Sequence, residues 1–242
     1  MKGTWLLPTR GRPQTLKRFI DSANATGMST PGSILYSDPA DIEGVVLPLN
    51  WNTHRTQAVG MGDKFREVWP LIKDMDWVGW VVDDLIPETQ GWDKTLIGGL
   101  NGENVISCND GARAPFRMCA PVFSGDWLRA LGYLYPPDLF WHSYWDDALE
   151  RLGRATDSWW VCMDVTLRHV DAFQTGIADA THMHSYGKSD KDRADLMTWR
   201  RTEMDAAVRR IMALKADYRN VNALRKSATG VMDEALRKVA NA

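Results

Sequence analysis

Short apolar runs alternate with amphipathic stretches through the first two-thirds of the chain. Residues 3–9 form an apolar run broken by Pro8, which predicts a buried strand that ends in a loop. Residues 13–24 instead place apolar side chains three or four positions apart behind a proline, as in an amphipathic helix. The same reasoning predicts further strands at 33–38, 76–84, 104–108 and 159–170, and helices at 53–73, 92–100, 124–131 and 141–152.

The pattern changes after residue 190. Residues 190–240 contain no proline and a single glycine, and are rich in alanine, leucine, methionine, arginine and lysine. They predict two or three helices with a buried stripe formed by Val208, Ile211, Met212 and Leu214. The alternation before residue 190 predicts an α/β fold, in which helices cover both faces of a largely parallel sheet.

Composition agrees with a globular protein. The 242 residues are 44% hydrophobic and 25% charged, with a formal net charge of −2. No apolar run approaches the ~20 residues of a membrane-spanning helix, so we expect no membrane partner. The first residues meet glycine, proline and arginine too early for a signal peptide. Three cysteines without a CxxC pair argue against a disulfide framework or a cysteine zinc site, and we expect a cytoplasmic protein.

Two imbalances bear on function. Twelve residues are tryptophans, and four of them fall between residues 141 and 160 (Trp141, Trp145, Trp159 and Trp160). They indicate either an aromatic core or a rim on which sugar or base faces stack. Residues 200–242 hold ten lysines and arginines against five acids, a net charge of +5. This basic stretch is either a solvated helix face or a surface that meets phosphates.

Ligands of open parallel sheets bind beyond the carboxyl ends of the strands, and polar residues follow four of the predicted strands. The sharpest of these features is Asp83-Asp84, at the end of an apolar strand. Adjacent strand residues point to opposite sides, so one carboxylate can face a ligand while the other anchors the loop. A carboxylate there can hold a divalent cation that neutralises phosphates. The alternative is a strand-end aspartate that caps the next turn.

Three segments carry a resemblance to the GT-A glycosyltransferases, and above all to phage-encoded inverting members. Residues 83–100 (DDLIPETQGWDKTLIGGL) resemble a strand that ends in a DD variant of the DXD motif and continues into a T-x-G-W-D turn. Residues 135–153 (YPPDLFWHSYWDDALERLG) are similar to the family segment with two prolines, H-x-Y-x-D and a helix. Residues 163–170 (MDVTLRHV) resemble the strand that ends in a metal-binding histidine. With PTRGRP at 8–13, the resemblance spans residues 4 to about 170 and leaves out the C-terminal helices.

The resemblance implies a nucleotide site around the first three strands. The base and ribose of the donor would be held by Pro8, Thr9, Arg10 and Asp38. Arg12 would reach the diphosphate, Asp83 would face the ribose or the metal, and Asp84 would bind Mn²⁺ or Mg²⁺. Leucine stands where a full triple-aspartate motif has its third acid, which leaves open which aspartate is the ligand. Trp92 and Asp93 would contact the donor sugar or the acceptor.

The resemblance also implies a general base and a second metal ligand. Asp146 would take the proton of the acceptor hydroxyl, with the adjacent Asp147 as the alternative. Both acids also suit the first turn of a helix for structural reasons alone. His169 would be the second metal ligand, and its rival is His184, within an H-x-H run that follows this strand in the relatives.

Taken together, these residues predict a metal-dependent transferase that moves a sugar from a nucleotide-sugar, expected to be a UDP-sugar, to an acceptor hydroxyl with inversion. Residues 1–185 would form the GT-A domain and 186–242 a C-terminal helical extension. The resemblance to phage enzymes implies a hydroxymethylated pyrimidine in DNA as acceptor and the host cytoplasm as location. The alternatives are a catalytically degenerate nucleotide-binding module and a nucleotidyltransferase. The sequence does not specify the oligomeric state.

Overall fold

The computed structural model describes residues 1–111, 118–140, 143–170 and 189–240, with side chains up to residue 222. Within these residues eight strands form one curled sheet, in the order β3-β2-β1-β4-β7-β6-β8-β5. The strands are β1 Gly3–Pro8, β2 Gly32–Tyr36, β3 Trp51–Arg55, β4 Trp77–Trp80, β5 Leu85–Pro87, β6 Val105–Asn109, β7 Val122–Ser124 and β8 Trp159–His169. The helices are α1 Pro13–Ala25, η1 Pro39–Ile42, α2 Met61–Ile72, α3 Trp92–Gly98, α4 Gly125–Leu131, α5 Trp145–Ala155, α8 Ser189–Thr202 and α9 Met204–Ala240.

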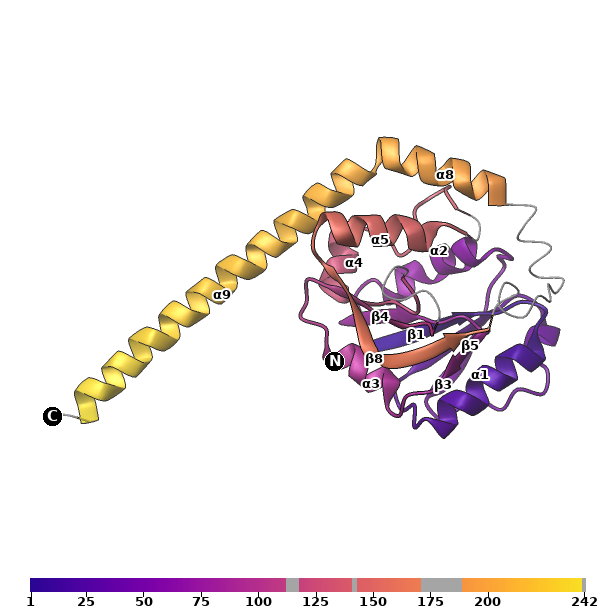
Figure 1. Cartoon of the computed structure of the whole chain (residues 1–242), viewed down its shortest axis with the longest axis horizontal. Helices are drawn as coiled ribbons and strands as arrows, with labels where there is room; N and C mark the ends of the chain where they lie inside the picture. Colours follow the sequence, from indigo (N-terminus) through magenta and orange to yellow (C-terminus); the bar gives the residue numbers. More distant parts are fainter. Residues whose placement is uncertain (112–117, 141–142, 171–188, 241–242) are drawn as a thin grey trace.

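The sheet combines a parallel half with a mixed half. Strands β3, β2, β1 and β4 run parallel to one another, as the strand–helix alternation predicts. The short strand β7 is inserted antiparallel between β4 and β6. Strand β8 pairs parallel with β6 and antiparallel with β5. The predicted α/β fold with helices on both faces is confirmed, and the antiparallel strands are what the alternation could not reveal (Figure 1).

Two predicted helices begin later than expected. The helix predicted at 53–73 begins at Met61, and its first residues form the edge strand β3. The Trp51 ring lies where a β-carbon on Gly32 would stand, which brings β3 against β2. The helix predicted at 141–152 begins at Trp145, because Tyr144 has a left-handed backbone with φ of 65° that cannot continue a helix.

The sheet separates two apolar clusters. Helices α1 and α3 cover one face, and α2, α4 and α5 cover the other (Figure 1). Most of the aromatic excess is core, because nine tryptophans of the described residues are buried. Five of them are fully buried: Trp5, Trp92, Trp127, Trp145 and Trp199. Trp160 differs, because 44% of its surface is exposed. Its ring therefore remains a candidate for stacking on a sugar or a base.

The C-terminal helices share the core of the α/β body. Leu196 and Trp199 of α8, and Ala207 and Ile211 of α9, are buried in the cluster that α4 and α5 form. The predicted stripe is correct at Ile211 and wrong at Met212, which is exposed, because α4 and α5 cover a narrower face of α9. The later part of α9 runs away from the body (Figure 1). No helix among the described residues has both the length and the hydrophobicity of a membrane span.

The docking of α8 can be tested at Trp199, whose ring meets Trp145 edge to face and whose Nε1 donates to the Tyr133 hydroxyl. We expect Trp199→Ala to lower the free energy of unfolding by about 3–5 kcal/mol, because it leaves a cavity in the shared core. Met197→Ala, on the exposed side of the same helix, should change it by less than about 0.5 kcal/mol. Urea unfolding measures both, and equal effects would mean that α8 does not pack as described.

Candidate functional site

The carboxyl ends of β1 and β4 bring together residues more than seventy positions apart. The Thr9 hydroxyl donates to Asp83 Oδ2 at 2.8 Å. The Arg12 guanidinium bonds Asp83 Oδ1 at 2.8 Å and Asp84 Oδ2 at 3.3 Å. Asp83 is fully buried and Asp84 nearly so, so each carboxylate depends on such partners to remain charged away from water.

Strand β8 adds His169 to this cluster. Its Nε2 lies 3.2 Å from Asp84 Oδ1. The backbone fixes this approach, because β5 follows Asp84 directly and pairs antiparallel with β8, with Leu85 opposite His169. The Val170 amide also donates to the Asp84 carbonyl, and the His169 amide donates to the Asp110 carbonyl. Asp84 and His169 are thus held side by side by the strands that carry them.

The donor set fits a divalent metal in kind. Carboxylate oxygen and imidazole nitrogen both suit Mn²⁺, and Asp84 and His169 present one of each. The described part of the chain holds no group of three or more such ligands. His184, the rival ligand, lies outside the described residues.

Lys64 is a buried cation at this edge that the sequence reasoning missed. Its Nζ donates to the carbonyls of Thr9 at 2.7 Å and Leu35 at 3.2 Å, so α2 ties the end of β1 to the end of β2. The side chain is 1% exposed, and burial lowers the pKa of Lys64 to about 8, against the opposing charges of Asp41 and Asp83. A signal existed, because this lysine stands on the apolar stripe of an amphipathic helix, beside Phe65.

Asp41 also ties the same two loops together. Its carboxylate accepts from the amides of Gly11 at 2.6 Å, Ser37 at 3.2 Å and Asp38 at 3.0 Å. The predicted ribose ligand Asp38 is exposed, and it caps η1 through the Ala40 amide. Pro8 ends β1, and Arg10 follows in the loop as a partly exposed residue.

Trp92 and Asp93 are placed away from this edge. Trp92 is fully buried, with its ring centroid 4.9 Å from that of Trp5. Asp93 is also buried, and its Oδ2 accepts from the amides of Ser29 and Thr30 and from the Thr30 hydroxyl. These partners precede β2, so they lie at the amino end of that strand, and the structure gives both residues a packing role.

Asp146 and Asp147 occupy the first turn of α5, where each is partly exposed. Burial raises the pKa of the Tyr135 hydroxyl, and the charges of Asp146 and Asp192 add to that rise. The segment before α5 packs on the start of α2, since a β-carbon on Gly62 would lie 2.5 Å from the Phe140 carbonyl. Two residues later, α2 presents Lys64 to β1. The first turn of α2 therefore connects the Asp146 segment to the strand-end cluster.

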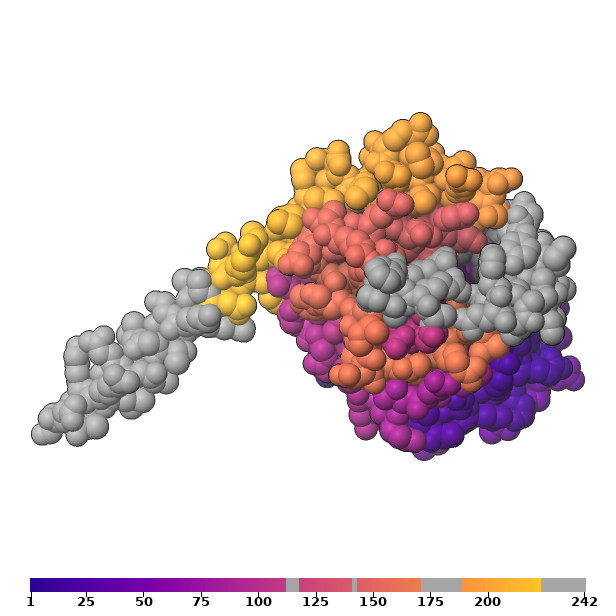
Figure 2. Space-filling view, in the orientation of Figure 1, coloured from indigo at the N-terminus to yellow at the C-terminus, as the bar shows by residue number. Residues whose placement is uncertain are grey.

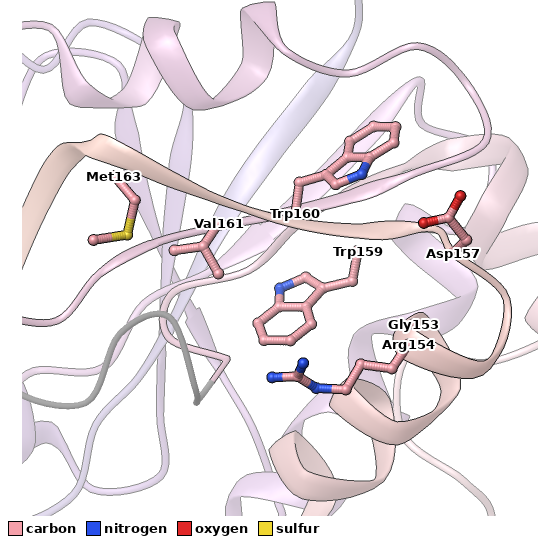
Figure 3. Close-up of a pocket in the computed structure, with 7 residues that line it drawn as sticks. All are labelled: Gly153, Arg154, Asp157, Trp159, Trp160, Val161 and Met163. Atoms are coloured by element: carbon pink, nitrogen blue, oxygen red, sulfur yellow. The ribbon is translucent and has the colours of Figure 1, made fainter.

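A separate cavity of about 480 Å³ lies along the amino half of β8 (Figure 3). The Arg154 guanidinium stacks 4.8 Å above the Trp159 ring, and the exposed Trp160 lies on the other side of the strand (Figure 3). The residues that line it reach Met163 and include none of the strand-end cluster. This cavity is therefore distinct from the strand-end cluster.

Comparison with known proteins shows the fold. No family model and no curated protein sequence matches this chain. A mannosyltransferase from Pyrobaculum calidifontis, solved in complex with GDP-Man and Mn²⁺, superposes with a TM-score of 0.52 and 12% identity, over 95% of this chain and 79% of its own. The chain has a GT-A-like fold.

Two further solved structures are similar to this GT-A-like chain. One is a putative nucleotide-diphospho-sugar transferase from Desulfovibrio desulfuricans G20, with a TM-score of 0.48 and 13% identity over 87% of this chain and 99% of its own. The other is a nucleotidyl transferase from Methanothermobacter, with a TM-score of 0.47 and 10% identity over 81% of this chain and 99% of its own.

The buried Lys64 predicts a specific pH dependence of stability. Between pH 8 and 10.5 the unfolded chain retains a proton on this amine that the native state has lost, so native stability rises with pH. We expect wild type to gain about 1 kcal/mol over Lys64→Met between pH 8 and pH 9, and nothing between pH 6 and pH 7. Urea unfolding measures the difference, with Lys73→Met on the exposed side as control. If the difference in unfolding free energy between wild type and Lys64→Met did not change with pH, the burial of a titrating amine would be contradicted.

Proposed function

We propose that the protein is a metal-dependent glycosyltransferase, which moves a sugar from a nucleotide-sugar to an acceptor hydroxyl with inversion. The observation that carries the proposal is the cluster of Thr9, Arg12, Asp83, Asp84 and His169 at the carboxyl ends of the strands. In open α/β sheets this edge is where nucleotides bind. The GT-A-like fold supports the same class of reaction.

The donor nucleotide would lie across the ends of β1 and β2. Thr9, Arg10 and Asp38 would contact its base and ribose, since Lys64 and Asp41 hold these loops from below. Arg12 would turn from the two carboxylates to the diphosphate when a ligand occupies the edge, because guanidinium pairs equally well with phosphate oxygens.

Asp84 and His169 would hold Mn²⁺ or Mg²⁺, and Asp83 would face the ribose or the same cation. The metal would supply positive charge to the departing nucleoside diphosphate. The chain's own contribution is to keep the two ligands adjacent through the pairing of β5 with β8. Arg12 balances the acids in the absence of a ligand.

Asp146 would act as the general base, with Asp147 as the alternative. The carboxylate would take the proton of the acceptor hydroxyl while the oxygen of that hydroxyl bonds to the anomeric carbon. The bond from that carbon to the nucleoside diphosphate would break on the opposite face, which inverts the configuration. Both carboxylates are partly exposed at the start of α5.

The finer identity of the substrates is part of the proposal. We propose a UDP-sugar as donor and, from the resemblance to phage-encoded enzymes, a hydroxymethylated pyrimidine in DNA as acceptor. The ten lysines and arginines of residues 200–242 favour an anionic acceptor. The competing reading is a nucleotidyltransferase, which would release pyrophosphate instead of a nucleoside diphosphate.

A donor screen tests the proposed class. UDP-sugars and GDP-sugars with Mn²⁺ should raise the melting temperature by about 5 °C or more at saturating ligand, since only the native state binds them. Asp84→Ala should remove the metal-dependent part of the shift and keep the fold. Release of a nucleoside diphosphate on turnover supports a glycosyltransferase. Binding without any turnover would favour the degenerate module, and no shift with any donor would overturn the proposal.

The general base is tested by removing one charge at a time. Asp146→Asn should lower kcat at least about 100-fold, because the loss of a general base typically costs 10²–10⁴. Asp147→Asn should cost much less, and Asp74→Asn, an exposed aspartate on the turn after α2, should leave turnover unchanged. The reverse order would assign the role to Asp147. Full activity in both variants would contradict a base in this turn.

A further inference from the structure

The segment that leads into α5 has an unusual backbone. Five non-glycine residues in the described part of the chain have a positive φ, and three of them fall here: Asp138 at 59°, Phe140 at 56° and Tyr144 at 65°. Residues with a β-carbon rarely adopt this region, and such strain persists only where the surroundings enforce it. The segment ends at the turn that carries Asp146 and Asp147.

Helix α2 restrains this segment by binding the carbonyl groups of the segment. The Arg66 guanidinium donates to the carbonyls of Pro136 and Leu139, both at 2.8 Å. Asp63, one turn earlier, pairs with the same guanidinium at 2.5 Å and fixes its direction. One arginine thus binds two carbonyls, one on each side of Asp138.

Helix α8 restrains the same segment by binding the backbone amide groups of the segment. Asp195 Oδ2 accepts from the Phe140 amide at 2.8 Å, and Asp192 Oδ2 accepts from the Ser143 amide at 2.7 Å. Asp192 is fully buried, and Lys191 pairs with Asp195 at 2.6 Å. Hydrogen bonds from backbone amides to carboxylates are about twice as strong as neutral ones. Two acids of the C-terminal region therefore hold a loop about fifty residues earlier.

We propose that Asp192 and Asp195 are positioning residues of the transferase, which hold the strained segment so that Asp146 and Asp147 face the acceptor. The inference rests on the proposed function. It makes α8 a part of the active-site architecture, although α8 lies outside the segments that resemble GT-A enzymes. Figures 1 and 2 show α8 lying over α5 at this end of the molecule.

The physical reason is the sensitivity of proton transfer to geometry. Without the Asp192 carboxylate, the Ser143 amide loses its acceptor, and Tyr144 is free to relax toward a negative φ. That change would turn the first residues of α5, and a displacement of about 1 Å at a catalytic group can cost about 100-fold in rate. Phe140 is anchored independently by its packing on Trp145, with ring centroids 5.4 Å apart, so loss of the clamp need not unfold the segment.

The test compares Asp192→Ala and Asp195→Ala with Asp190→Ala, an exposed aspartate on the same helix. Amide hydrogen exchange over residues 136–149 gives a readout that needs no substrate. We expect at least tenfold faster exchange in this peptide for the first two variants, and no change for the third. Asp192→Asn, which keeps the shape and one acceptor oxygen, should restore most of the protection.

Kinetics then separate positioning from general stability. Both alanine variants should lower kcat at least tenfold and leave the affinity for the donor nucleotide within twofold of wild type, with partial rescue by Asp192→Asn. Equal losses of donor binding and kcat would indicate a structural role alone and would overturn the proposal. So would unchanged exchange and unchanged kcat. If Asp192→Ala fails to fold, Asp195→Ala and Asp192→Asn carry the same comparison.

A failure of the proposed function would be distinguishable from a failure of this inference. The first would show as wild-type protein that neither binds nor turns over any nucleotide-sugar. The second would show as an active wild type whose α8 variants exchange amide hydrogens and turn over normally. Altered exchange in an inactive wild type would support the clamp and overturn its role in transfer.

Discussion

Two carboxylates are buried beyond the carboxyl end of β4, and their charge determines which residues must lie beside them. The strand predicted at 76–84 ends at Trp80, and Asp83 and Asp84 lie in the turn before β5. Neither carboxylate could stay charged there without cations and donors close by. Arg12 and Thr9 approach from β1, and His169 approaches from β8. Three segments distant in sequence are therefore fixed at one edge by the need to compensate two negative charges.

A second layer of buried charge supports the edge from beneath. Lys64 binds the carbonyls at the ends of β1 and β2, and Asp41 binds amides of the loops that follow the same strands. A cation thus holds carbonyl groups and an anion holds amide groups, each in the orientation that suits its charge. Such fixed dipoles give a ligand site its shape before the ligand arrives, which lowers the ordering cost of binding.

The same device recurs at the start of α5. Arg66 binds carbonyl groups of the segment before α5, and Asp192 and Asp195 bind its amide groups. Without these bonds the backbone would relax from its positive φ angles. The two halves of the candidate site meet on α2, which contributes both Lys64 and Arg66. The C-terminal helices contribute Asp192 and Asp195 to the segment before α5, and they contribute apolar side chains to the core.

The alternating elements, the α/β class and the acidic pair Asp83-Asp84 could be predicted from the residues alone, because hydrophobic period and strand-end chemistry are local properties. The sequence also supplied Arg12 and His169 through a family resemblance. It could not give the antiparallel insertion of β7, the burial of Trp92 and Asp93, or the roles of Lys64, Asp41 and Asp192. Those depend on which surfaces meet after folding, since one aspartate is solvated, caps a helix or clamps a distant loop according to the amides that face it.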